Sequence, residues 1–520
     1  MEKIKKILRT LTLWVRKNPQ EAFFLGVILL IAAVLRLYRI ADYMTFLGDE
    51  GRDAIIVRRL LVDGDLILIG PGTSIGNMYL GPLYYYLIAP SLLLANFSPI
   101  GPAVFVALLG IATVFGVYYV GREWFGRSAG LISAFLYSLS SVVIIYSRSS
   151  WNPNIMPFFA LFCIYSLWKI WEKRRWKWLF VLATSFAFVL QSHYLGLLLA
   201  PTILIFWVWT FRNLKLIGNR KLEIGNFLRY SAIGMAIFAG LMSPLVIFDA
   251  RHGWNNFAAV KKFFVERQET VSARPWSALP KFIPLSEKIT TRLVTGKNAS
   301  AGVKVTLIAS IGVLWLTYLG LRRRKVEVNR KALLLIFSWL GFAVLGLGLY
   351  KQEIYDHYFG FFFAAPFLLI GAVLGYINSR GALGKIVSLV ALLILLELGL
   401  KDTPLGYPPN YQLVRTREVA AKIRDEAFGE KFNLAVVAER NYEDAYQYFL
   451  EAWDTEVTDI DPLVLDETIG KYLFVVCELP REKCDPTNNP KAEVANFGWS
   501  KVEAEWEVGG VILYKLAHAQ

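Results

Sequence analysis

Long apolar runs separated by short polar segments occupy most of the first 400 residues of the chain. A helix needs about 20 apolar residues to cross the hydrocarbon core of a bilayer. A shorter apolar stretch, 79–94, is predicted to lie along the membrane surface. Runs close to the spanning length predict eleven membrane-spanning helices, at 22–40, 101–120, 129–147, 155–171, 178–194, 196–211, 229–247, 303–321, 332–350, 358–377 and 384–400.

The polar connections between these predicted spans differ in charge. Basic loops stay in the cytoplasm, and the basic loops of this chain all fall on one side of the membrane. We therefore predict a multi-pass protein of a cell membrane, with a cytoplasmic amino terminus, an extracytoplasmic carboxyl terminus and long outer loops at 41–100 and 248–302. The basic connections are 121–127, 172–177, 212–229, 321–325 and 380–385.

Composition agrees with a membrane protein, because 55% of the residues are hydrophobic and the mean hydropathy is +0.44. The net charge of +15 is unevenly distributed. Residues 1–400 hold 43 Lys and Arg against 19 Asp and Glu, whereas residues 401–520 hold 13 against 22. A basic membrane rim joined to an acidic tail does not indicate nucleic-acid binding, so we expect the lipid bilayer and no nucleic acid as a partner.

The acidic tail has the pattern of a small α/β domain. Strand-like runs at 432–437 and 472–476 flank a segment with helical spacing, 442–453, and 502–516 predicts a hairpin around two glycines. We thus predict a membrane domain at 1–400 and an extracytoplasmic α/β domain at 401–520. Cys477 and Cys484 lie in the tail and can form a local disulfide or stay free thiols; the pattern leaves both open.

A pair of carboxylates, Asp49 and Glu50, lies in the first long outer loop. Packing explains such a pair poorly at the mouth of a many-helix membrane protein, and it is typical of a catalytic centre at the membrane surface. The alternative is that the pair caps a surface helix, because acidic residues favour helix amino termini.

Four motifs in a fixed order give this pair a context. The Asp-Glu pair is followed by Gly81-Pro82-Leu83-Tyr84-Tyr85-Tyr86-Leu87, by Gly121-Arg122-Glu123-Trp124-Phe125-Gly126-Arg127 and by Tyr146-Ser147-Arg148. This order resembles the polyprenyl-phosphate-sugar-dependent glycosyltransferases of the GT-C fold, in particular the protein O-mannosyltransferase and aminoarabinose transferase group. The resemblance covers the first 200 residues in motif detail and the remainder only in layout.

The resemblance implies an enzyme that moves a sugar from a polyprenyl-phosphate donor to an acceptor hydroxyl on a protein, lipid or polysaccharide, with inversion at the sugar carbon. Asp49 matches the catalytic acidic position of the family and would take the proton of the acceptor hydroxyl, with Glu50 in support. Arg148 matches a basic position of the family. Cations on outer segments would hold the donor phosphate, and we select Arg52, Arg148, His193, Arg251, His252 and His357.

Aromatic and polar residues on the same outer segments are candidates for the substrate cavity. Interfacial aromatic belts and helix-ending turns are the competing explanations. The cavity candidates are Tyr84, Tyr85, Trp151, Asn152, Asn154, Asp249 and Tyr355.

The chain departs from the family in the second outer loop, 149–154, where amides stand in place of a carboxylate. We therefore predict no metal site and no cofactor. A divalent metal held by Asp49, Asp249 or His252 remains an alternative, although these residues form no ligand-spacing motif.

Two other functions fit a many-helix chain. A transporter or lipid flippase is the non-enzymatic alternative, but the polar residues gather on outer loops and no repeat between halves is evident. An oligosaccharyltransferase ranks below a monosaccharide transferase, because the Trp-Trp-Asp motif expected after the membrane domain is missing. The sugar, the lipid length and the acceptor are not specified by the sequence.

Overall fold

The computed structural model describes residues 2–519 except 74–77, 217–220, 267–269 and 323–328, so parts of two predicted basic loops lie outside the described residues. Eight helices within the described ranges are long and apolar enough to cross a membrane. They are α2 (Pro19–Leu37), α6 (Ile100–Phe125), α9 (Met156–Trp171) with the turn before it, α11 (Ala200–Leu216) with the turn before it, α12 (Lys221–Arg251), α15 (Ala299–Arg322), α16 (Arg330–Leu349) and α18 (Gly381–Lys401).

The other three predicted spans are shorter or broken. The run 358–377 is a pair bent by 62°, the 3₁₀ helix η4 (Asp356–Phe362) followed by α17 (Ala364–Asn378). The run 129–147 breaks at Ser140, which has an extended backbone, into α7 (Arg127–Leu139) and α8 (Ser141–Tyr146). The run 178–194 is α10 (Trp178–Ser192).

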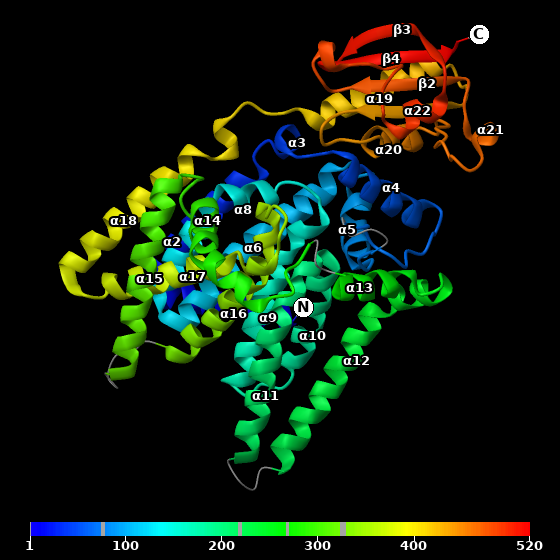
Figure 1. The fold of residues 1–520 in the computed structure, drawn as a ribbon. Helices are drawn as coiled ribbons and strands as arrows, with labels where there is room; N and C mark the ends of the chain where they lie inside the picture. Colours follow the sequence, from blue (N-terminus) through cyan, green and yellow to red (C-terminus); the bar gives the residue numbers. More distant parts are fainter. Residues whose placement is uncertain (1, 74–77, 217–220, 267–269, 323–328, 520) are drawn as a thin grey trace.

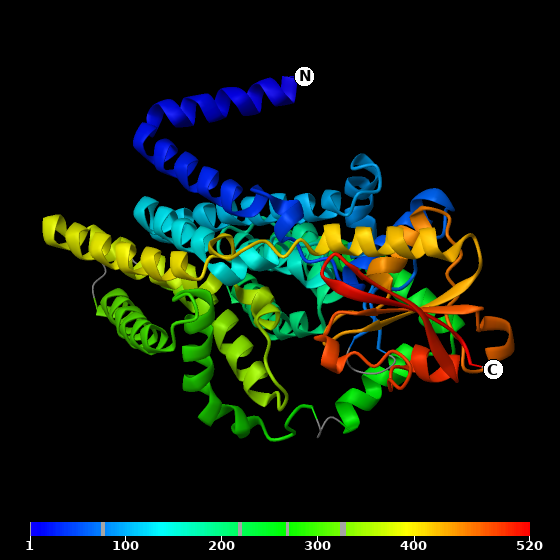
Figure 2. The same cartoon turned by 90° about the horizontal axis from the view of Figure 1, so that it is seen from above.

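Shorter helices fill the loops. The apolar stretch after the first long loop forms α5 (Leu83–Leu94), whose 12 residues are too few to cross a bilayer, in line with the prediction of a non-spanning segment. The remaining helices of this part are α1 (Glu2–Lys17), α3 (Ile40–Tyr43), α4 (Gly48–Val62), α13 (Asn255–Glu266) and α14 (Phe282–Leu293). Figure 2 shows α1 standing away from the other helices on one side, whereas α2 packs against α6 and α7.

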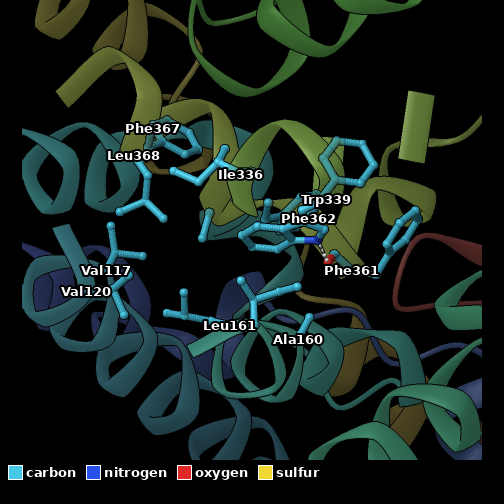
Figure 3. Packing of buried hydrophobic residues seen from close by; sticks show 14 of the residues in the cluster. Val117, Val120, Ala160, Leu161, Ile336, Trp339, Phe361, Phe362, Phe367 and Leu368 are labelled. Atoms are coloured by element: carbon cyan, nitrogen blue, oxygen red, sulfur yellow. Dashed lines mark hydrogen bonds between the residues drawn. The ribbon is translucent and has the colours of Figure 1, made fainter. Parts of the chain in front are cut away.

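Aromatic and aliphatic side chains pack together in the core of the helical part (Figure 3). Trp339 of α16 is 1% exposed and its indole Nε1 donates a hydrogen bond to the carbonyl of Phe361 at 3.0 Å. Phe361 and Phe362 of η4 and Leu161 of α9 pack in the same cluster. The bent η4–α17 segment is thus held at its bend by the core, which fixes the position of its first residues.

The tail forms the α/β fold that its pattern predicts. Its sheet has the order β1-β2-β4-β3, in which β1 (Phe432–Val437) is parallel to β2 (Tyr472–Cys477) and the hairpin β3 (Ser500–Val508)–β4 (Val511–His518) is antiparallel. Gly509 and Gly510 turn the hairpin with positive φ angles of 58° and 79°. Cys477 and Cys484 form a disulfide. The helices are α19 (Gln412–Ala427), α20 (Asp444–Ala452), α21 (Leu465–Thr468) and α22 (Ala492–Phe497).

This C-terminal domain, α19 to β4, lies against α4 at one end of the helical bundle (Figure 1). Alternate residues of β1 face opposite sides, and Phe432, Leu434 and Val436 share a core with residues of α19 and α20. That core also contains Phe46, Ala54 and Ile55 from the loop after α2. The loop that carries Asp49 and the C-terminal domain are therefore packed as one unit.

Candidate active site

Helix α4 carries the acidic residues of the site. Its first turn is closed by Glu50, whose Oε2 accepts a hydrogen bond from the Leu47 amide at 3.0 Å. The Gly48 amide donates to Asn441 Oδ1 of the C-terminal domain at 2.9 Å. The capping interpretation thus holds for Glu50, which is 7% exposed, but not for Asp49.

Asp49 takes part in a charged cluster along one face of α4. Arg52 Nη1 donates to Asp49 Oδ1 at 2.8 Å, and Arg52 Nη2 donates to Asp53 Oδ1 at 2.7 Å. Tyr85 of α5 also donates to Asp53 Oδ1, at 3.3 Å. Asp53 is 1% exposed and its Oδ2 has no partner among the described residues, whereas the Asp49 side chain is 40% exposed. Asp49 is therefore the carboxylate of the cluster that a substrate can reach.

Burial controls the protonation of the two enclosed carboxyl groups. It raises the pKa of Glu50 to about 8 and that of Asp53 to about 6, the second against the opposing effect of Arg52. The pKa of Arg52 is raised despite its own burial, because Asp53 and Asp49 favour its charged form. Arg52 is thus a fixed positive charge between two carboxylates.

The raised pKa of Glu50 predicts a pH-dependent stability. Stability from this group is fully present below its ordinary pKa of about 4.5 and is lost as the pH rises through about 8. Glu50→Gln keeps an acceptor for the Leu47 amide and does not titrate. We expect equal thermal midpoints for variant and wild type at about pH 5 and a wild-type midpoint several degrees lower at about pH 9. If the thermal midpoints of the two proteins changed in parallel with pH, the raised pKa of Glu50 would be contradicted.

A cavity of about 420 Å³ opens beside Asp49. Its lining comes from α4 and the loop after it, from the α8–α9 connection, from the residues after α10, and from the first turn of η4 with the residue before it. Seven of the predicted site residues line it, namely Asp49, Arg52, Trp151, Asn152, His193, Tyr355 and His357, together with Pro71, Gly72, Thr73, Leu80, Pro153, Tyr194 and Tyr358.

The two histidines of the cavity lie close together, with ring centroids 5.7 Å apart. His193 Nδ1 accepts a hydrogen bond from the Leu195 amide at 3.2 Å, so in the neutral ring Nε2 carries the proton and can donate. Trp151 lies edge-on to His357 at 4.7 Å. Asn152 Nδ2 donates to the Ser192 carbonyl at 2.8 Å and ties this loop to the end of α10. The cavity therefore offers neutral N–H donors beside an acidic group.

Four predicted site residues lie behind the cavity wall. Tyr84 is 1% exposed and shares a hydrogen bond with Ser150 Oγ at 2.7 Å, and Tyr85 is fully buried against Asp53. Asn154 donates to the Ser149 carbonyl at 2.8 Å. Arg148 is 2% exposed and donates to the carbonyls of Leu35 and Tyr38 at the end of α2. The positive charge of Arg148 stabilises the carboxyl terminus of α2. Arg148 does not line the cavity.

The segment after α12 also lies outside the cavity wall. Asp249 accepts hydrogen bonds from the amides of Asn256 and Phe257, at 2.7 and 2.8 Å, and so caps α13. Arg251 is exposed, and the exposed His252 contacts the Phe248 carbonyl through Nδ1. These three residues fit the helix-ending turn that competed with the cavity-wall hypothesis.

Asp53, Tyr358 and Tyr442 belong to the site but were not selected from the sequence. Asp53 stands four positions after Asp49, so helical spacing could have placed both on one face of α4. Tyr442 donates to Asp49 Oδ1 at 2.6 Å from the C-terminal domain, and no local signal connects it with residue 49.

The donor set around Asp49 does not fit a metal site. No group of three or more His, Cys, Asp or Glu suited to a metal ion occurs in the described part of the chain. Asp49 and Asp53 both bind the Arg52 guanidinium, and Asp249 and His252 have other partners. We derive no step through a metal, and metal independence stays a prediction.

The fold and the site define the class of this protein as a multi-pass membrane protein of the GT-C fold. Residues 80–247 match the model of the Dolichyl-phosphate-mannose-protein mannosyltransferase family, which confirms the resemblance seen in the motifs. No curated protein matches this sequence significantly.

Solved structures carry the fold assignment. ArnT from Cupriavidus metallidurans bound to undecaprenyl phosphate superposes with a TM-score of 0.59 at 14% identity, covering 96% of this chain and 98% of that chain. The archaeal oligosaccharyltransferase AglB from Archaeoglobus fulgidus, with an inhibitory peptide and a dolichol-phosphate, gives 0.53 at 14% identity and covers 89% and 70%. A complex of the Archaeoglobus fulgidus oligosaccharyltransferase with Zn and sulfate gives 0.52 at 15% identity and covers 87% and 67%.

Proposed function

We propose that the protein is a membrane glycosyltransferase that moves a sugar from a polyprenyl-phosphate donor to an acceptor hydroxyl on the outer face of the membrane, with Asp49 as general base. The observation that carries the proposal is the cavity in which Asp49 and Arg52 meet Trp151, His193 and His357. The undecaprenyl phosphate of the ArnT structure and the dolichol-phosphate of the AglB structure support a polyprenyl-phosphate donor.

The chemistry requires a base next to the acceptor hydroxyl. In the proposed step the acceptor oxygen attacks the anomeric carbon, the bond from that carbon to the phosphate oxygen breaks, and the acceptor proton passes to Asp49. Both hydrogen bonds recorded for Asp49 within the described ranges end on Oδ1, which leaves Oδ2 for the acceptor proton. A single displacement of this kind inverts the configuration at the anomeric carbon.

The leaving phosphate gains negative charge as the bond breaks. Donors placed at that position stabilise the transition state more than the ground state. His193 and His357 are the proposed phosphate contacts, because they line the cavity on the side formed by the ends of α10 and η4. Arg52 contributes its positive charge from α4 while it holds Asp49.

The proposal is tested with the full-length protein in lipid nanodiscs and polyprenyl-phosphate donors that carry a radiolabelled sugar. We expect release of polyprenyl phosphate and transfer of label to at least one acceptor from a panel of peptides, lipid-linked sugars and oligosaccharides. A proteoliposome assay in the same lipids tests the alternative of a transporter or flippase. Movement of the intact donor across the bilayer, with no bond cleavage under any acceptor, would overturn the proposal.

A further inference from the structure

The C-terminal domain contacts the catalytic helix at its first turn. The Tyr442 hydroxyl donates to Asp49 Oδ1 at 2.6 Å, and Asn441 Oδ1 accepts the Gly48 amide at 2.9 Å. Burial and the neighbouring Asp49 carboxylate raise the pKa of Tyr442 well above its ordinary value, so this hydroxyl keeps its proton and donates it. Two consecutive residues of one loop thus hold two consecutive residues of α4.

This loop is anchored to the sheet of its own domain. Asn441 is 7% exposed, and its Nδ2 donates to Glu478 Oε1 at 2.6 Å, directly after β2. The Tyr446 hydroxyl donates to the same oxygen at 2.5 Å. A carboxylate at the end of a central strand therefore sets the position of the loop, and the loop sets the start of α4.

The approach of the two segments is too close for side chains on α4. A Cβ at Gly48 would overlap the ring of Tyr442, and a Cβ at Gly51 would overlap the backbone of Asp444 and Ala445. Glycine is required where two backbones approach this closely. Farther along α4, Arg59 pairs with Glu451 of α20 at 2.7 Å, so the contact continues past the first turn.

We propose that Tyr442 is a positioning residue for Asp49, by which the C-terminal domain orients the general base. With Arg52 it binds Oδ1 from a second direction, so the carboxylate cannot rotate and Oδ2 stays available to the acceptor hydroxyl. Tyr442 does not line the cavity, so it acts through Asp49 and not on the substrate. The inference rests on the proposed role of Asp49.

The test compares Tyr442→Phe with Tyr514→Phe, which removes a hydroxyl from a buried tyrosine of β4 on the sheet face that does not pack against α4. Hydrogen bonds to charged groups support an expected loss of kcat of about tenfold to a hundredfold for Tyr442→Phe, with the donor KM within about twofold of wild type. Tyr514→Phe should keep kcat within about twofold of wild type. Equal kcat for the two variants would overturn the inference.

A second measurement distinguishes this inference from the proposed function itself. In an Asp49→Asn background, Tyr442→Phe should cause no further loss, because residues that act as one unit are not additive. Full turnover in Asp49→Asn would reject Asp49 as the general base and, with it, the proposed function. Full turnover in Tyr442→Phe, with turnover lost in Asp49→Asn, would reject only the positioning role of Tyr442.

A third readout needs no turnover. Deuterium exchange of a peptide covering 47–53 should speed up in Tyr442→Phe and stay at the wild-type rate in Tyr514→Phe. Identical exchange in both variants would also overturn the positioning role.

Discussion

Replacement of Asp49 by Asn is expected to lower the rate of sugar transfer by about 10²- to 10⁴-fold, the range that general-base catalysis contributes. The variant should fold, because the Asn amide oxygen can still accept the hydrogen bonds from Arg52 and Tyr442. The donor KM should change little, since the proposed phosphate contacts are His193 and His357. Initial rates with a radiolabelled polyprenyl-phosphate sugar measure both parameters.

A matched control lies in the same loop. Asp42 pairs with Arg39 at 2.6 Å and does not line the cavity, so Asp42→Asn should retain wild-type turnover. Turnover of Asp49→Asn equal to that of the Asp42→Asn control would remove Asp49 from the mechanism.

The second large effect concerns stability. Arg52→Ala would leave Asp53, which is 1% exposed, as a buried carboxylate without its cation. Removing one partner of a buried ion pair lowers the free energy of unfolding by about 3–5 kcal/mol. We therefore expect a clear fall of the thermal midpoint in detergent. The double variant Arg52→Ala/Asp53→Asn should recover much of this loss, because no unpaired charge then remains.

The pH dependence of this effect has a defined sign. The pKa of Asp53 is raised to about 6, so the carboxyl is ionised above that pH and neutral below it. Arg52 lowers the pKa of Asp53, so Arg52→Ala raises this pKa further, and the cost of the substitution should grow as the pH rises above about 6 and shrink in more acidic buffer. Arg59→Ala on the same helix is the control, because Arg59 is half exposed and its pair with Glu451 is worth about 0–1 kcal/mol. Equal losses for the two arginine variants at every pH would contradict the buried-pair argument.

Local patterns predicted most of the architecture. Each predicted span coincides with a helix or a broken pair, and β1, β2 and the β3–β4 hairpin lie where their runs were found. The length of each apolar run and the spacing of its apolar residues are enough to predict these elements, because both reflect how that single segment is buried. The break at Ser140 and the bend after Phe362 were not foreseen, since each depends on neighbouring helices.

The sequence by itself determined the membrane class, the C-terminal α/β fold, the family resemblance and the selection of Asp49, because apolar length, periodicity and motif order are written along the chain. Only the tertiary structure decided which polar groups meet. It brought His193 and His357 to Asp49, enclosed Arg148 at the end of α2, and turned Asp249 into a helix cap. It also joined Tyr442 to Asp49 across 393 positions. Contacts of this kind depend on how packed elements meet in space, and no local spacing encodes that arrangement.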